Sequence, residues 1–273
     1  MIQTVVDMMS LGFIQRAVLV GTLISLCAAL LGVSLVLKRY SMIGDGLSHV
    51  GFGVLTVATA LGYSTPLYIA IPCVTICAII LLKMGNRSKV KSDSAIALIS
   101  SSALAIGVAA TSLTTGLNTD VCNFMFGSIL AMSKTDVYLS IIVSIVVAIL
   151  FVIYYRKLFV VTFDEEFAKA SGLKAQRYTS IIAVLTALII VVGMRMMGVM
   201  LISSIIIFPA LTSMRIFKSF KKVVISSGIV SVVSFLLGIY LSYLYNISTG
   251  AMIVIVNLVL FILFTIIDKI IHE

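Results

Sequence analysis

Long apolar segments alternate with short polar ones along the whole 273-residue chain. A transmembrane helix needs about 20 consecutive apolar residues, and most of these segments come close to that length. They are apolar on all sides and lack the alternation of a barrel strand, so the pattern predicts an all-α polytopic transmembrane helical bundle. The expected spans are 17–37, 42–62, 66–83, 94–114, 135–155, 178–194, 197–213, 223–245 and 250–268.

The number of crossings stays open at eight or nine. The segments 178–194 and 197–213 are short and meet at Arg195–Gly198, so the pattern leaves open whether both of them cross. A shorter apolar stretch, Val121–Met132, is too brief to cross ~30 Å of hydrocarbon and is expected to dip into the membrane or lie on it. We find no second domain and no solenoid repeat, so we expect residues 1–273 to form a single transmembrane domain.

Composition agrees with this picture and excludes a water-soluble enzyme. Residues of the AVILMFWYC group make up 61% of the chain and charged residues only 11%, against roughly a quarter charged in a soluble domain. The cysteines lie in or beside apolar runs and are interpreted as packing residues, although Cys73 and Cys77 share a helix face and could bind a soft metal. Residues 1–10 lack the basic start and the cleavage site of a signal peptide.

Positive charge is distributed unevenly over the connections. If the first span runs from outside to inside and the rest alternate, sixteen of the nineteen lysines and arginines fall in cytoplasmic connections. Only Arg16, Lys134 and Arg195 fall outside, and such a bias reports membrane orientation. The C-terminus and the 156–177 connection are therefore predicted to be cytoplasmic. These connections and anionic lipid explain the net charge of +9, which requires no nucleic-acid partner.

The main hydrophilic interruption runs from Tyr155 to Tyr178. Within it, residues 163–172 are expected to form a short amphipathic helix: acidic residues suit its N-terminus, Phe163 and Phe167 are four residues apart, and a glycine can end it. The connection is about twenty residues long, whereas plain connectors in helical bundles have roughly two to eight. A docking role for a cytosolic partner is therefore favoured over a mere connector.

Ionisable side chains inside apolar spans usually mark a functional pathway. Asp45 and His49 are four residues apart in the second span, so they share one helix face, and His49 is expected near mid-bilayer. A carboxylate oxygen and a neutral imidazole nitrogen suit Zn²⁺, Mn²⁺ or Fe²⁺, and the remaining ligands are left to water or a second copy. In the alternative interpretation, Asp45 caps its helix and His49 bonds a neighbouring carbonyl.

Other residues in the spans carry weaker predictions. Four glycines around the Asp–His pair either admit a neighbouring helix or leave room for an ion and its water. These glycines are Gly44, Gly46, Gly51 and Gly53. The three methionines between residues 194 and 197 are interpreted as packing residues rather than as a thioether metal relay. Pro209 is expected to kink or unwind its helix, which is compatible with a gate and with plain bundle geometry.

Residues 41–53 resemble the S-L-I-G-D-A-L-S-H-A-x-x-P-G signature of the permease subunits of zinc, manganese and iron ABC importers. Further similar segments follow in the family's order: 93–97 resembles D-x-A-I-G, 123–130 resembles L-F-G-x-L, 163–172 resembles F-D-x-E-x-A-x-x-x-G, and 195–210 resembles x-x-G-x-L-L…I-P-A. The resemblance covers nearly the whole chain. It departs at Gly53, near a common family proline, and at 248–250, which keeps only the glycine of a proline–glycine pair.

The resemblance implies a permease, not an enzyme, that lines a path for a divalent metal as a homodimer or pseudo-dimer. Asp45 and His49 would hold the metal, and an extracytoplasmic binding protein would deliver it to external loops that include 117–120 and 245–249. Two cytosolic ATPase subunits would dock on the 163–172 helix. The residues that match for coupling are Phe163, Asp164, Glu166, Phe167, Ala168 and Gly172, and those for gating or packing are Gly44, Gly53, Gly198 and Pro209.

The residues themselves agree with that implication on two counts. Charge alone assigns the docking helix to the cytoplasmic side, and the chain has no G-x-x-x-x-G-K-[ST] loop, so ATP hydrolysis falls to a partner subunit. We expect a bacterial or archaeal cell membrane, with zinc and manganese as equal candidates and iron as a lesser one. The alternative is a stand-alone ion-coupled secondary transporter or channel. An intramembrane enzyme is disfavoured, because there is no H-E-x-x-H and the other histidine is the near-terminal His272.

Overall fold

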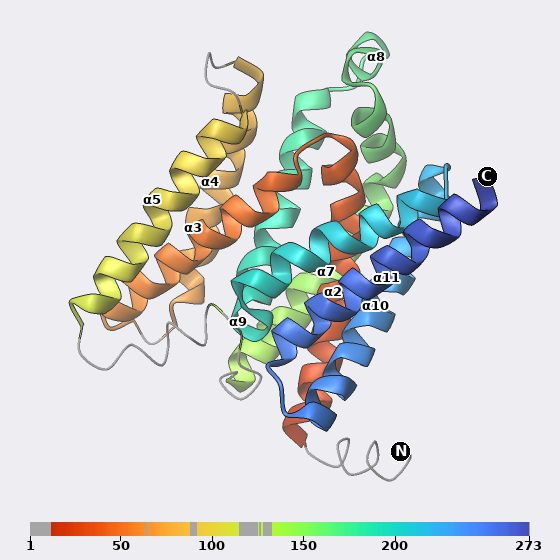
Figure 1. The fold of residues 1–273 in the computed structure, drawn as a ribbon. Coiled ribbons are helices and arrows are strands. Elements are labelled where there is room, and N and C mark those ends of the chain that lie inside the picture. The colour runs from red at the N-terminus through yellow and green to blue at the C-terminus, as the bar shows by residue number, and fades with distance from the viewer. Residues whose placement is uncertain are drawn as a thin grey trace.

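The computed structural model describes residues 12–63, 65–87, 92–114, 125, 127 and 133–272. Within these ranges the regular structure is helical and contains no strand, which confirms the all-α prediction (Figure 1). The helices are α2 (Gly12–Leu37), α3 (Ser41–Ala60), α4 (Leu67–Arg87), α5 (Ser92–Ser112), α7 (Lys134–Phe163), α8 (Glu165–Ala170), α9 (Ala175–Ile216), α10 (Phe220–Tyr245) and α11 (Thr249–His272).

Six of the described helices are long and apolar enough to cross a membrane, namely α2, α5, α7, α9, α10 and α11. Helix α4 carries a shorter apolar stretch, Leu67–Leu82. Helix α3 falls outside this group because its glycines, serines and Asp–His pair make it less apolar. The bundle is therefore that of a multi-pass membrane protein, while the predicted count of eight or nine crossings is not confirmed.

Helix α9 has 42 residues, about twice the roughly 20 that a crossing requires. Its backbone leaves helical geometry at Gly198 (φ 81°, ψ 163°), in a region that is essentially open to glycine alone. Figure 1 shows the two segments taking different directions from this point, which is where the sequence pattern separated 178–194 from 197–213. Pro209, where the sequence predicted a kink or unwinding, is buried and lies within helical backbone, so the helix does not unwind there.

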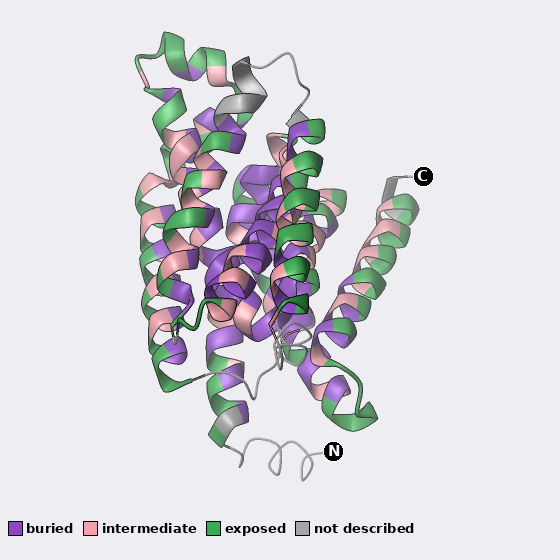
Figure 2. Cartoon of the chain, turned by 90° about the vertical axis from the view of Figure 1, so that its left-hand side faces the viewer, coloured by how far each residue is buried: buried purple, intermediate pink, exposed green. Residues whose placement is uncertain are grey.

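Helix α9 occupies the centre of the bundle. In its most apolar window 78% of the residues are buried, against 22% in α5 and 28% in α11. Figure 2 shows the buried residues gathered in the middle, with exposed positions on the outer helices. Helix α2 packs so closely on α9 that a side chain at Gly32 would overlap the carbonyl oxygen of Ile206. The apolar side chains exposed on the outer helices are those expected of a surface that faces lipid.

Helix α7 continues to Phe163, well beyond the predicted span of 135–155. Its polar end is accommodated on the outside of the bundle, where the Lys157 ammonium lies 5.5 Å from the centre of the Tyr178 ring. The predicted connection of about twenty residues is therefore too long. Only residues 164–174 separate α7 from α9, and α8 takes up six of them.

Candidate functional site

Asp45 and His49 lie one turn apart on α3, as predicted. The helix begins at Ser41, directly after a turn in which Arg39 adopts a left-handed conformation (φ 60°). His49 Nε2 and Asp45 Oδ2 are 3.7 Å apart, which is longer than a hydrogen bond. The Asp45 side chain is 46% exposed and that of His49 is 25% exposed. The two side chains share a face without being bonded to each other, so both retain donor atoms for a ligand.

Asp45 lines a cavity of about 670 Å³ between α3, the second segment of α9, and α11. The other polar side chains on its wall are Ser203 and Ser204, and the rest of the lining is largely apolar. The Ser203 hydroxyl lies 3.0 Å from that of Ser48, which joins α9 to α3 beside the Asp–His pair. A carboxylate on an otherwise apolar wall attracts a cation more strongly than it would in water.

The two alternative roles considered for this pair do not fit the structure. Tyr40 occupies the N-cap position of α3 and no side chain caps this end, so Asp45 is not a helix cap. His49 Nδ1 is buried and has no hydrogen-bond partner in the described part of the chain. Those same residues contain no group of three or more His, Cys, Asp or Glu side chains placed so that together they could hold a metal ion. A metal ion at the pair therefore needs further ligands from water or another chain.

The glycines of α3 serve close packing. A side chain at Gly53 would overlap the carbonyl oxygen of Ala103 on α5, and a Cβ at Gly51 would lie 2.7 Å from the sulfur of Met194 on α9. At Gly44 a Cβ would make ordinary contact with α9, at 3.5 Å. Of the two interpretations left open, these contacts favour the approach of neighbouring helices over room for an ion. Met194 itself is fully buried, in line with its interpretation as a packing residue.

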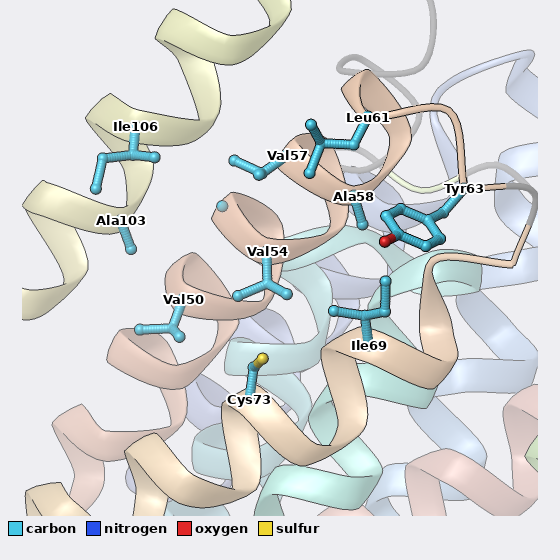
Figure 3. A pocket seen from close by; sticks show the side chains of 11 residues that line it. Val50, Val54, Val57, Ala58, Leu61, Tyr63, Ile69, Cys73, Ala103 and Ile106 are labelled. Carbon is cyan, nitrogen blue, oxygen red and sulfur yellow. The ribbon is translucent and has the colours of Figure 1, made fainter.

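A second cavity of about 410 Å³ lies between α3, α4 and α5. Figure 3 shows apolar side chains from all three helices around it, with the thiol of Cys73 and the hydroxyl of Tyr63 as polar groups. Its lining has no carboxylate or imidazole, and the one thiol, that of Cys73, supplies a single ligand where zinc takes about four. The Cys27 thiol is buried and donates to a backbone carbonyl of α7, as a packing residue would, and Cys122 lies outside the described residues.

Helix α8 lies at one end of the bundle, at the top of Figure 1. Asp164 is its N-cap, and its Oδ1 accepts a hydrogen bond from the backbone N–H of Phe167 at 2.8 Å. The chain leaves the helix through Gly172, whose φ of 79° suits glycine. Ala168 is buried in a small apolar cluster with neighbouring helices, whereas the Phe167 and Glu166 side chains are exposed. The short helix therefore has one anchored face and one open face.

Phe163 is not part of this helix, contrary to the prediction of one helix over 163–172. It is the last residue of α7, and its ring packs 5.0 Å from that of Phe159 and 5.9 Å from that of Phe220. The reason is that Asp164 takes an extended conformation (φ −147°) in order to cap α8, which ends α7 one residue earlier. Phe163 and Phe167 consequently do not share a helix face.

The structure contains two buried polar contacts that the sequence pattern did not predict. Lys38, at the end of α2, contacts Glu165 on α8 at 3.4 Å, and nothing in the local pattern relates these distant residues. Arg195 on α9 contacts Asp136 on the first turn of α7 at 3.3 Å, close to the break in α9. A signal for Asp136 does exist, because Ser133 and Asp136 form a capping box whose S-x-x-D spacing is visible in the sequence.

Two predicted segments lie largely outside the described residues. They are the external loop 117–120 and, apart from Met125 and Gly127, the 121–132 stretch that was expected to dip into the membrane or lie on it. The other predicted loop, 245–249, is a short turn between α10 and α11. There the Ser242 hydroxyl donates to the carbonyl of Ile247 at 2.7 Å.

The comparisons with known proteins cover nearly the whole bundle. The family model described as ABC 3 transport family matches residues 10–268. The high-affinity zinc uptake system membrane protein ZnuB of Haemophilus influenzae is 32% identical over 249 residues, which are 90% of this chain and 94% of that protein. The manganese import system permease protein ScaB of Streptococcus gordonii is 30% identical over 250 residues, covering 92% and 89%. The solved structure of PsaBC from Streptococcus pneumoniae in complex with Fab matches with a TM-score of 0.86 at 29% identity, over 97% of this chain and 95% of that one.

Proposed function

This chain belongs to the ABC 3 transport family, and from that premise we propose that it is the membrane-spanning subunit of an ATP-driven importer for zinc or manganese. The observation that carries the proposal is the Asp45–His49 pair on α3, of which Asp45 lines a cavity between helices. Relatives named for zinc uptake and for manganese import support both metals, and iron, which accepts the same donors, is a lesser candidate. The subunit itself catalyses no covalent chemistry.

We propose that a second permease copy completes the metal site. One Asp–His pair supplies two ligands, whereas these metals take about four to six. The cavity beside Asp45 is bounded by α3, α9 and α11, and a twin chain that faces it would bring a second carboxylate and a second imidazole to the same path. A homodimer satisfies this requirement most simply, and a paralogous permease with the same pair would satisfy it too.

The cytosolic partner is an ATPase subunit that docks on α8. Two features support this role: Phe167 and Glu166 are exposed on the open face of the helix, and Ala168 anchors the opposite face. Asp164 and Gly172 define where the helix begins and ends, so the docking surface has a fixed shape. Phe163 supports this surface from α7, through its ring contacts, rather than from α8 itself.

The orientation follows from the charge bias of the sequence. Placing α8 and the C-terminus in the cytosol leaves only Arg16, Lys134 and Arg195 on the outer side, in agreement with the positive-inside rule. A binding protein that brings the metal would then dock on the outer loops, including 245–249. ATP-driven closure of two ATPases would move the α8 helices of both copies and change which side of the path is open. This sequence of events is alternating access.

The proposal is tested in proteoliposomes that contain the permease, its ATPase and its binding protein. Asp45→Ala and His49→Ala are each expected to lower zinc or manganese uptake by about tenfold or more, because removal of a metal ligand weakens binding at least that much. The matched control is Thr59→Val. Thr59 lies on the same helix, about 15 Å from His49 at ~1.5 Å per residue, and bonds only within α3. Unchanged uptake in both alanine variants at equal expression would show that the site is wrong.

A stand-alone secondary transporter or channel is the alternative function. The same Asp–His pair could then relay protons. Such a carrier would have no use for the capped and exposed helix α8. Metal flux through liposomes that contain this chain alone would favour the alternative, and a stable complex with an ATPase together with ATP-dependent uptake would favour the importer.

A further inference from the structure

Lys38, the first residue after α2, is buried where three other helices meet. Its side chain is 7% exposed. Its ammonium group donates to the carbonyl oxygen of Val161 at 3.1 Å and to Thr179 Oγ1 at 2.9 Å. It also donates to Glu165 Oε2 at 3.4 Å. These partners belong to α7, α9 and α8, so the three N–H donors of one ammonium group bind three different helices.

The burial of an ammonium group costs more free energy than a contact that only holds helices together requires. A buried ammonium group loses its hydration and recovers the cost only when its donors are used. Burial lowers the pKa of Lys38, while the carboxylate of Glu165 acts in the opposite direction. A matched set of apolar residues would hold the helices together at lower cost. The polar cluster therefore suits a role that depends on the bonds themselves.

On its other side Lys38 is tied to the helix that carries the candidate metal ligands. The backbone N–H of Tyr40 donates to the carbonyl of Leu35 at 2.8 Å and closes α2, and its carbonyl accepts from the N–H of Ile43 at 3.0 Å and opens α3. Between them Arg39 takes the left-handed conformation that makes the reversal tight. The connection of α2 to α3 is thus three residues long, and each of its backbone N–H groups is hydrogen-bonded, so a displacement of Lys38 is passed directly to α3.

We propose that Lys38 is a positioning residue that transmits the movement of α8 to α3 during transport. The proposal rests on the proposed function, in which an ATPase docks on α8. When the ATPase displaces α8, Glu165 in its first turn pulls on Lys38. The bonded turn at Arg39 and Tyr40 then passes the displacement to the start of α3, one turn before Asp45. Lys38 touches neither the metal nor ATP.

The test measures coupling rather than activity alone. In the reconstituted complex of permease, ATPase and binding protein, the number of metal ions imported per ATP hydrolysed is compared between variants. Lys38→Met is expected to keep ATP hydrolysis and to lower this ratio by about fivefold, a typical effect of a residue on an energetic coupling. Glu165→Gln is expected to lower it less, because the amide oxygen of glutamine still accepts a hydrogen bond from Lys38 but carries no charge. Lys38→Arg is expected to restore most of the ratio, since it keeps the charge and the donors.

Lys134→Gln is the matched control. Lys134 is an exposed lysine in the first turn of α7, and within the described residues it makes no contact with Lys38 or α8. Its ratio is expected to equal that of the wild type. Manganese binding to the purified permease is measured in parallel and is expected to stay unchanged in every variant, since none of them alters the metal ligands.

Each outcome decides the proposal. A wild-type ratio in Lys38→Met overturns it, as does a complex that loses hydrolysis and uptake in equal proportion, because Lys38 would then be a structural support only. If Lys38→Met fails to fold, Glu165→Gln is the test variant. A wild-type number of metal ions imported per ATP hydrolysed in Glu165→Gln would also overturn the proposal. Failure of the proposed function looks different: the wild-type chain would bind no ATPase, or would move metal without ATP.

Discussion

Two polar clusters lie only seven residues apart along the chain, and they are built in opposite ways. Around Lys38 every donor of the ammonium group has a partner, and the partners come from three helices. Asp45 and His49 lie 3.7 Å apart, the half-exposed Asp45 carboxylate lines a cavity, and His49 Nδ1 is buried without a partner in the described structure. We call the first cluster closed, because each donor of its ammonium group has a partner, and the second incomplete, because it has a buried nitrogen without one.

The difference between the clusters suits two different roles for polar residues, the binding of a ligand and the transmission of a displacement. A buried group without a partner costs about 1–3 kcal/mol, and a bound ligand that supplies the partner removes that cost. Satisfied polar networks instead hold one arrangement and pass on a displacement of any member. We therefore assign binding to the incomplete cluster and transmission to the closed one, and this assignment predicts opposite responses to mutation.

The largest effect on stability is expected from Lys38→Met. The substitution leaves the Glu165 carboxylate, the Thr179 hydroxyl and the Val161 carbonyl without their shared donor. Breaking a buried ion pair typically costs about 3–5 kcal/mol, and because Glu165 is a quarter exposed we expect about 2 kcal/mol of unfolding free energy. The measurement is the thermal unfolding midpoint of the purified chain in detergent. A midpoint equal to that of the wild type would contradict the description of this cluster as closed.

An intermediate effect is expected from Arg195→Gln. Arg195 lies 3.3 Å from Asp136, and both side chains are mostly buried. The Asp136 carboxylate also accepts a hydrogen bond from the backbone N–H of Ser133 at 3.1 Å, so it keeps one partner when the guanidinium is removed. We expect a loss of about 1 kcal/mol, the net value of an ordinary hydrogen bond. The midpoint is compared with that of Lys134→Gln, an exposed neighbour whose substitution should change nothing measurable.

A double-mutant cycle isolates this contact. Asp136→Asn combined with Arg195→Gln should cost less than the two single changes added together, by about 1 kcal/mol. Strict additivity would show that the two side chains do not interact, and the contact near the break in α9 would then have no role in holding it.

The incomplete cluster was predictable from sequence and the closed one was not. Asp45 and His49 are four residues apart on one helix, so helical periodicity alone brings them together. Lys38 is separated from its partners by between 123 and 141 residues, and only the packing of α2 against the other helices brings them within reach. Local pattern reports contacts within an element, and contacts between elements depend on the fold.

The limits of local sequence pattern also explain the outcome at two helix boundaries, the break in α9 and the end of α7. The apolar pattern separated 178–194 from 197–213 at Arg195–Gly198, and the structure breaks α9 at that place, where Gly198 takes φ 81°. The end of α7 was misplaced because hydropathy marks where a segment leaves the apolar layer, not where its hydrogen bonds end. Helix α7 continues past that layer to Phe163, where contacts with aromatic rings of α7 and α10 favour the helical conformation.

The smallest effect on stability, and the sharpest contrast with Lys38, is expected from Asp45→Asn. The carboxylate is nearly half exposed and makes no hydrogen bond to His49, so its replacement by a side chain of the same shape should change the unfolding free energy by less than about 0.5 kcal/mol. What should disappear is the response to metal. A ligand at 100 times its dissociation constant stabilises the protein that binds it by about 2.7 kcal/mol, so manganese should raise the midpoint of the wild type but not that of Asp45→Asn. If Asp45→Asn loses as much stability as Lys38→Met, Asp45 is a structural residue. If its midpoint still rises with manganese, Asp45 is not needed for metal binding. Either result would remove the distinction between an incomplete and a closed cluster.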